Sequence, residues 1–287
     1  MLSAALGFLG SIIYGASDFF GGLAAGRIRA EKVTAITSVV GLALLLAIAP
    51  LAGAVFTPGA VLWGTIAGVI GTIAIVLLYA SLAIGPMSIL APIMALVSAV
   101  VPISIAFVRG ERLSVTGYLG LALGLVAVLL ICFVPGTRVV RPKLRGVLFA
   151  LAAGVAVGLY LTFIDLSPSG TGLASLIVVF AVSAAITGLW VLIRWLSGAR
   201  APAQEPAPRF RGGVALAVYA GVTDAAASAL FLAALRLGDL SVVSVLSAMS
   251  PAGTILLAAI VLRERVAIVQ WIGFAVALAA AALLALV

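Results

Sequence analysis

The chain has 287 residues, of which 65% are hydrophobic and only 8% are charged, and its mean hydropathy is +1.40. This composition lies far outside that of soluble globular domains and predicts an integral membrane protein embedded in a lipid bilayer. The 16 Lys and Arg residues outnumber the 8 Asp and Glu residues, but most of them flank long apolar runs, which argues against a nucleic-acid-binding surface.

Ten apolar runs follow one another along the chain, and each is long enough to cross a hydrocarbon core of about 30 Å as a helix. The runs are continuous rather than alternating, which favours helices over a β-barrel. We therefore predict an all-α membrane protein with ten transmembrane helices. The predicted helices span residues 2–25, 33–56, 60–83, 86–108, 114–134, 146–166, 171–197, 212–235, 240–262 and 266–287.

The second half of the chain repeats the first. Each copy contains five predicted helices, and because five is odd, the second copy must enter the membrane from the opposite side. We therefore predict two inverted five-helix repeats, a pattern typical of secondary transporters. The first repeat covers 1–135, a basic linker covers 136–145, and the second repeat covers 146–287. Positions that match under a shift of 153 residues are Gly85 with Gly238, Ser88 with Ser241, Glu111-Arg112 with Glu264-Arg265, and Gly120 with Gly273.

Two segments carry a family resemblance: GPMSILAPIMALVSAVVPISIAFVRGERLSVTGYLGLALGLVAVLL and GDLSVVSVLSAMSPAGTILLAAIVLRERVAIVQWIGFAVALAAAALL. They resemble the two halves of EamA-type members of the drug/metabolite transporter superfamily. In that family a proline-bearing helix is followed by a Glu-Arg turn and a glycine-containing last helix. The resemblance covers essentially the whole chain. It implies a ten-helix fold and efflux or exchange of small metabolites or drugs, without selecting a substrate.

The first predicted helix carries a stripe of small residues and one acid. Small residues let neighbouring helices approach closely, which explains the glycines. Asp18 needs another explanation, because a carboxylate inside the bilayer costs roughly 2.5–3.5 kcal/mol even on the lenient scale. The alternative is a position near enough to the helix end to reach interfacial water. Small multidrug members of the superfamily exchange protons through an acid in their first helix, and Asp18 resembles it. The stripe consists of Gly7, Ser11, Gly15, Asp18, Gly22 and Gly26.

A second acid, Asp224, lies near the middle of the predicted helix 212–235. The equivalent position in the first copy is Gly71, so this acid is not part of the repeat. A residue present in only one copy indicates a role in function rather than in the repeated scaffold. No Lys or Arg lies mid-membrane to neutralise either acid, and an apolar environment favours the neutral form of a carboxyl group. We therefore predict proton coupling through Asp18 and Asp224, with a cationic group of the substrate competing for the same negative charge.

We predict a substrate cavity between helices 1, 3 and 4 and helices 6, 8 and 9. Pro92, Pro102 and Pro251 are expected to kink two of these helices. Of the aromatic residues that could line the cavity, Tyr14 and Tyr219 are favoured over Trp63, Tyr79 and Tyr160, because they share helices with the two acids. For the serines, hydrogen bonding between helices is the alternative role. The predicted substrate-binding residues are Tyr14, Ser17, Tyr219, Ser228, Ser244 and Ser247.

The residue inventory argues against other classes of protein. Histidine is absent and Cys132 is the one cysteine, so the sequence predicts no metal site, no cofactor and no intrachain disulfide. An enzyme would need intramembrane bases or paired acids that are not evident. We therefore predict a secondary active transporter of small molecules, a proton-coupled exporter or exchanger working by alternating access. The alternatives are an uncoupled carrier or importer of the same fold, and a membrane scaffold or enzyme.

The basic residues predict an orientation. One side of the membrane, after helices 1, 3, 5, 7 and 9, holds 13 of the 16 Lys and Arg residues. The positive-inside rule then places both termini outside the cytoplasm, in a multi-pass protein of the cell inner (plasma) membrane. The family resemblance implies the opposite, with both termini inside.

Overall fold

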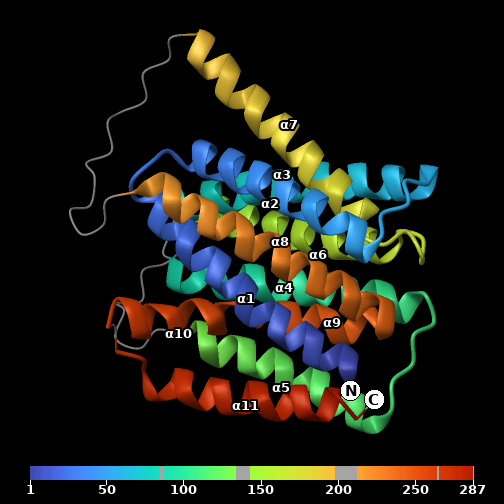
Figure 1. Cartoon of the computed structure of the whole chain (residues 1–287). Coiled ribbons are helices and arrows are strands. Elements are labelled where there is room, and N and C mark those ends of the chain that lie inside the picture. Colours follow the sequence, from blue (N-terminus) through green and yellow to red (C-terminus); the bar gives the residue numbers. More distant parts are fainter. Residues whose placement is uncertain (85–86, 134–142, 198–211, 264, 287) are drawn as a thin grey trace.

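The structure is a computed structural model that describes residues 1–84, 87–133, 143–197, 212–263 and 265–286. In this part of the chain, extended structure is limited to an isolated bridge between Ala54 and Gly172. The helices run roughly side by side (Figure 1). They are α1 (Leu2–Ala25), α2 (Ala30–Ala52), α3 (Pro58–Ile84), α4 (Met87–Val108), α5 (Val115–Cys132), α6 (Leu144–Asp165), α7 (Ala174–Leu196), α8 (Gly213–Leu237), α9 (Leu240–Ser247), α10 (Pro251–Val261) and α11 (Ile268–Leu284).

The ten predicted segments are all helical, which confirms the predicted fold class. Among the described residues, nine spans are long and apolar enough to cross a membrane when α9 and α10 are counted together. The last helix, α11, is apolar but has only 17 residues. Several predicted ends differ from the observed ones by two to four residues; for example, the second helix begins at Ala30 rather than at residue 33.

The predicted helix 240–262 is wrong in one respect, because the structure interrupts it between Ser247 and Pro251. Proline has no N–H, and its ring clashes with the carbonyl four residues earlier, which here belongs to Ser247. The chain instead makes short-range bonds: Met249 N donates to Leu246 O, and Ser250 N donates to Ser247 O, both at 3.1 Å. The fourth helix carries Pro92 and Pro102 and stays continuous.

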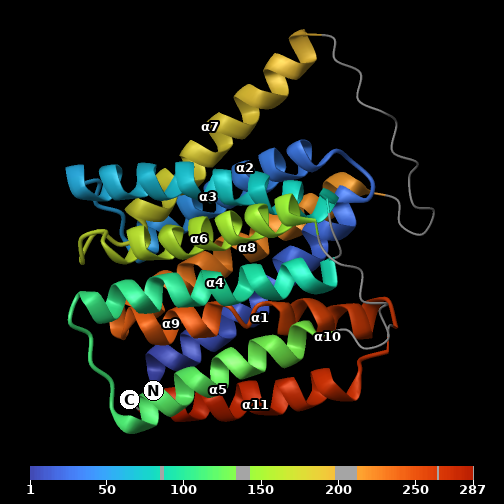
Figure 2. The ribbon, with the colours of Figure 1, turned by 180° about the vertical axis from the view of Figure 1, so that it is seen from behind.

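The two halves of the chain interlock helix by helix. Helix α1 lies along α8, and its counterpart α6 lies along α3. Helices α2 and α7 contact each other, as do α4 with α9 and α5 with α11, so each of these helices meets its own counterpart. Exchanging the two halves therefore turns this set of contacts into itself, as two inverted copies of one unit require. Both termini lie at one end of the bundle, which we name the terminal end (Figures 1 and 2).

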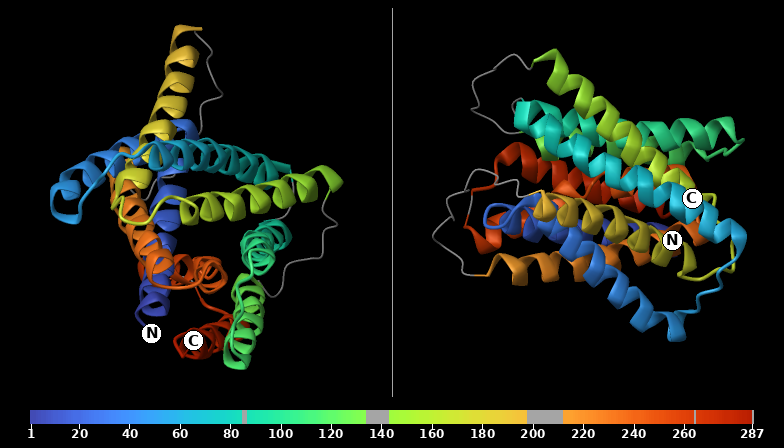
Figure 3. Two further views of the ribbon diagram at one scale, coloured as in Figure 1. Left: turned by 90° about the vertical axis from the view of Figure 1, so that its right-hand side faces the viewer. Right: turned by 90° about the horizontal axis from the view of Figure 1, so that it is seen from above.

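Helix α7 leaves the bundle along its second half (Figures 1 and 3). Its large side chains there are exposed, including Trp190 at 55% and Trp195 at 76%. Lipid tails are a suitable neighbour for such apolar surface in a membrane. The buried residues instead gather in two main clusters, one centred on α5, α9 and α11 and the other on α6, α7 and α8.

Helices α1 and α10, from different halves, touch through their backbones. A Cβ atom on Gly15 would lie only 2.6 Å from Thr254 N and 2.7 Å from Gly253 Cα. The Thr254 hydroxyl donates to Gly15 O at 3.0 Å, across the same contact. Only glycine permits so close an approach at this position. We call this contact the glycine crossing.

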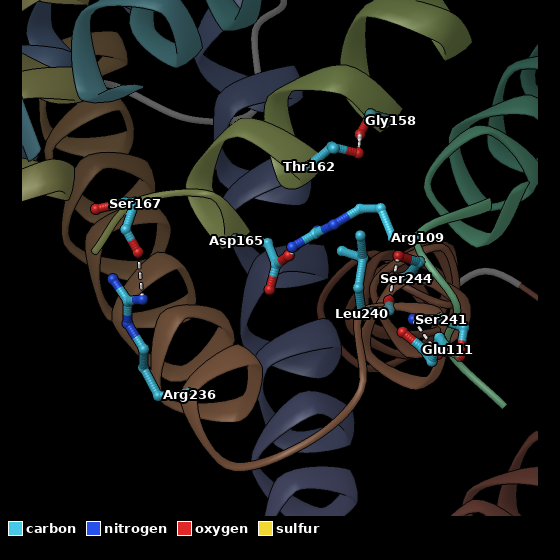
Figure 4. A network of polar contacts seen from close by, with 10 residues as sticks. All are labelled: Arg109, Glu111, Gly158, Thr162, Asp165, Ser167, Arg236, Leu240, Ser241 and Ser244. Carbon is cyan, nitrogen blue, oxygen red and sulfur yellow. Dashed lines mark hydrogen bonds and ion pairs between the residues drawn. The ribbon is translucent and has the colours of Figure 1, made fainter. Parts of the chain in front are cut away.

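A network of polar contacts closes the terminal end around α9 (Figure 4). The loop between α4 and α5 supplies Arg109, whose Nη1 lies 2.6 Å from Asp165 Oδ2 at the end of α6. The same loop supplies Glu111, whose Oε1 accepts from Ser241 N at 3.2 Å and from the Ser241 hydroxyl. Both contacts join the first half to the second. Nearby, Arg236 Nη1 donates to Ser167 O at 2.5 Å.

The Glu111 carboxylate caps the first turn of α9. Backbone N–H groups at a helix N-terminus have no partner within the helix, and negative charge is favourable there. Burial raises the pKa of Glu111 above its ordinary value, and the charge of Asp239 adds to this, while hydrogen bonds from Ser241 and Leu240 oppose it. The carboxyl group therefore combines a capping role with an environment that disfavours its charge.

The glycine crossing predicts different outcomes for two alanine substitutions on α1. Gly15→Ala should destabilise the protein by about 1–3 kcal/mol, because the new methyl group collides with the backbone of α10. Gly22→Ala is the matched control, since a Cβ atom there meets nothing within 4 Å. Thermal unfolding in detergent, followed by tryptophan fluorescence, measures both. Equal stability of the two variants would contradict the glycine crossing.

The raised pKa of Glu111 predicts a pH dependence of stability. The folded protein binds a proton at this carboxyl more tightly than the unfolded chain does, so the contribution is present at low pH. It is lost as the pH rises from the ordinary pKa through the raised one. Glu111→Gln should remove this slope, whereas Arg112→Ala in the same loop should retain it. Unfolding midpoints measured across this interval decide, and an unchanged slope in Glu111→Gln would refute the assignment.

Candidate functional site

The two intramembrane acids come from different halves and lie on two helices that pack against each other. Asp18 lies on α1, seven residues before its end at Ala25, and Asp224 lies near the middle of α8. Because α1 lies along α8, their carboxyl groups are close enough to interact electrostatically. Two like charges in this position repel, which favours a state in which at least one of the carboxyl groups is neutral or paired with a cation.

The side chain of Asp18 is accessible rather than enclosed in a packed core. Protein atoms surround its carboxyl group, yet the residue is exposed to a water-sized probe. Its neighbours along α1 explain this combination. Gly15 is in backbone contact with α10, whereas a Cβ atom on Gly22, two turns later, would have nothing within 4 Å. Beyond the glycine crossing, α1 thus stays packed on α8, while its face at Gly22 has no close neighbour.

Asp18 lies on the part of α1 nearer the end of the bundle opposite the termini. We name this the basic end because the loops that the sequence predicts on that side hold 13 of the 16 Lys and Arg residues. At the terminal end every residue of α9 from Leu240 to Leu246 is buried. In α10, which continues toward the basic end, only Ala252 and Gly253 are buried. The basic end has its own link between the halves, an ion pair of 2.9 Å between Arg194 Nη1 and Glu31 Oε1, but it joins α7 to α2.

Tyr160, which the sequence did not single out, belongs to the acid cluster. It lies near Asp224 and Ser228 of α8, and its ring lies against α3, where a Cβ atom on Gly71 would be 3.2 Å from Tyr160 Cδ2. Ser228 is buried at 6% exposure and lies one helical turn beyond Asp224, on the same face of α8. In the sequence Tyr160 is only one of several aromatic candidates, because it shares its helix with neither acid. Folding nevertheless brings Tyr160 near Asp224.

Two predicted substrate-binding residues lie in the α1–α8 interface. The Ser17 hydroxyl donates to Ala220 O at 3.0 Å, which ties α1 to α8. The Tyr14 ring packs at 6.1 Å from the Phe231 ring and contacts the buried cluster around α6 to α8. Both residues therefore help to hold together the two helices that carry the acids.

Three other predicted residues lie away from the acids or in packed surroundings. Tyr219 is 60% exposed, and its ring is tilted against the Phe20 ring with the centroids 5.8 Å apart. Five helical positions separate Tyr219 by about 140° from Asp224 around α8. Ser244 is fully buried and donates to Leu240 O at 2.5 Å, within its own helix. Ser247 is half-buried at the break before α10 and donates to Ser244 O at 2.9 Å. Of the aromatic alternatives, the side chain of Tyr79 lies outside the described part of the structure.

Comparison with known proteins agrees with this architecture. A family model described as the EamA-like transporter family matches residues 1–133 and 144–286. A solved structure described as "Crystal structure of protein" has a TM-score of 0.75 and 21% sequence identity, over 99% of this chain and 96% of that chain. This likeness shows a shared fold. No curated protein matches the chain. Because the two family matches cover nearly its whole length, the chain belongs to the EamA-like transporter family, whose members are membrane transporters of the drug/metabolite transporter superfamily.

Proposed function

We propose that this transporter exchanges protons for a small substrate with a positively charged group, using Asp18 and Asp224 as the shared binding site. The observation that supports this most strongly is the packing of α1 on α8, which brings together the two membrane helices that carry Asp18 and Asp224, one from each half. Neither acid has an ion-pair partner among the described residues. Protons and a substrate cation would therefore compete for the same negative charge.

This competition supplies the coupling. A site with uncompensated negative charge is costly to move through the hydrocarbon region. The change between its two open states becomes favourable when either protons or the substrate cation neutralise the carboxyl groups. Movement of one species in one direction then drives the other in the opposite direction. The same charge disfavours anionic substrates such as sugar phosphates.

The fold suggests how the site alternates between the two sides of the membrane. The terminal end is closed around α9 by contacts from Arg109 and Glu111, while Asp18, nearer the basic end, is accessible. In an inverted repeat the two halves can exchange conformations, which closes one end as the other opens. We propose that the halves rock about the glycine crossing, which lies beside both Asp18 and the break between α9 and α10.

We also propose boundaries for the two repeats and an orientation of the protein in the membrane. The repeats comprise residues 1–135 and 146–287, with the basic linker 136–145 between them; residues 136–142 of this linker lie outside the described residues. We propose that the protein lies in the cell inner (plasma) membrane. The excess of basic residues in the loops then favours a cytoplasmic location for the basic end. The described conformation is then open to the cytoplasm, ready to load a substrate for export.

Substitution of the acids tests the coupling. Purified protein in liposomes is first screened for flux of amino acids and organic cations. Asp224→Asn should abolish transport driven by a pH gradient, because the amide resembles the protonated acid, while substrate-for-substrate exchange is partly retained. Asp18→Asn should weaken cation binding or coupling. Glu31→Gln, at the Arg194 ion pair, is the control and should transport like the wild type.

Two results would count against this function. If Asp18→Asn and Asp224→Asn both transport with unchanged pH dependence, the acids are structural, and an uncoupled carrier of the same fold is the better description. If no compound in the panel moves or stabilises the protein while a sugar phosphate does, the preference for cations is wrong.

A further inference from the structure

We propose that Arg236, in the last turn of α8, binds the phosphate group of a membrane phospholipid in a pocket between α2, α8 and the loop that joins α6 to α7. The pocket lies apart from the two acids, because Arg236 follows Asp224 by twelve residues on α8, which is about 18 Å along the helix. The proposal therefore adds a lipid site to the protein and does not depend on the proposed transport mechanism.

The pocket is built from both halves of the chain. It has a volume of about 280 Å³, and its walls come from the end of α2, the α6–α7 loop and the last turns of α8. Ala52 and Gly170 in these walls are exposed, whereas Leu173 and Leu232 are buried. The pocket therefore extends from the surface of the bundle to buried side chains. Among the described residues that line it, Arg236 alone has a polar side chain.

Backbone contacts between the halves hold these walls in place. Leu173 N donates to Gly53 O at 2.9 Å, and Val55 N donates to Thr171 O at 3.1 Å. Gly172 has a φ of +56°, and a Cβ atom there would collide with Gly53 O, so the approach of the loop to the end of α2 requires glycine. The pocket is therefore already formed before any ligand binds.

The guanidinium group of Arg236 is only partly satisfied. Its Nη1 donates to Ser167 O at 2.5 Å. Its Nη2 is buried and makes no hydrogen bond within the described part of the chain, and the same is true of the Ser167 hydroxyl group. Figure 4 shows Asp165 facing Arg109, with which it forms an ion pair, so this carboxyl group does not supply the missing acceptor. An unpaired charged donor is costly, and an acceptor on a ligand would remove that cost.

A phosphate group has the required chemistry, because its oxygens accept hydrogen bonds from a guanidinium group at well-matched positions. The location of the pocket indicates a lipid as its source. Arg236 lies in the last turn of a membrane helix, the level at which lipid head groups lie. Leu51, next to Ala52 in the pocket wall, is 90% exposed, as expected of a side chain that contacts lipid tails. Acyl chains would cover this apolar surface while the phosphate reaches Arg236.

Native mass spectrometry of the detergent-purified protein, titrated with phosphatidylglycerol, tests the site. Diacylglycerol with the same acyl chains is the matched control ligand, since it has a hydroxyl group in place of the phosphate head group. Sodium phosphate is the third probe and distinguishes a lipid from a free anion. The first phosphatidylglycerol should bind at least about 10-fold more tightly than diacylglycerol, the value of one hydrogen bond to a charged group. Sodium phosphate alone should not bind measurably.

Two variants assign this preference to the pocket. Arg236→Gln should abolish it, whereas Arg112→Gln, which removes the same charge from an exposed position at the same end, should bind lipid like the wild type. Ala233→Phe fills the pocket and leaves Arg236 unchanged, so it keeps the test decisive if Arg236→Gln does not fold. It too should lose the preference, and Ala215→Phe at an exposed position of α8 is its control.

The proposal has two ways to fail. Equal affinity of the wild type for the two lipids, or a preference that persists in both Arg236→Gln and Ala233→Phe, would overturn the site. Sodium phosphate that binds as tightly as phosphatidylglycerol, and is lost in Arg236→Gln, would overturn the assignment to a lipid. Neither result bears on proton-linked transport, which the substitutions of Asp18 and Asp224 test separately.

Discussion

The backbone contact between α1 and α10 at Gly15 and Gly253 sets the geometry of the functional region. It brings together helices from opposite halves at a distance that no side chain allows, and Thr254 adds a hydrogen bond to Gly15 O. One turn beyond it lies Asp18, which is accessible, and immediately before it the helix breaks at Pro251. This backbone contact between the halves therefore lies next to the charge that the proposed mechanism moves and to the discontinuity that permits movement.

Much of the fold could be predicted because its signals are periodic and additive. Ten apolar runs separated by charged loops determine ten crossings, and the repeated Glu-Arg pair reveals the duplication. The break in the ninth segment was missed because a proline inside a membrane helix either kinks it or ends it, and Pro102 and Pro251 look alike in sequence. Which outcome occurs depends on whether neighbouring helices hold the chain together across the gap.

Of the residues in the candidate site, only the charged ones stand out in the sequence. Asp18 and Asp224 stand out because an acid in an apolar run is costly wherever it faces. Serine and tyrosine carry no such signal: Ser244 bonds to its own helix and is buried, and Tyr219 lies on another face of α8 from Asp224. Tyr160 was ranked below Tyr14 and Tyr219 because it shares its helix with neither acid, and contacts between helices cannot be read from a single sequence.

The central claim is that the charge on Asp18 and Asp224 decides which end of the bundle is open. Distances between spin labels measure this directly, with one pair at Val115 and Leu237 on the terminal end and another at Lys32 and Ile260 on the basic end. Between about pH 8 and about pH 5, the two pairs should change in opposite directions, and the double variant Asp18→Asn/Asp224→Asn should not respond to pH. Distances in the wild type that stay constant across this range, or a double variant with the full pH response, would contradict the account.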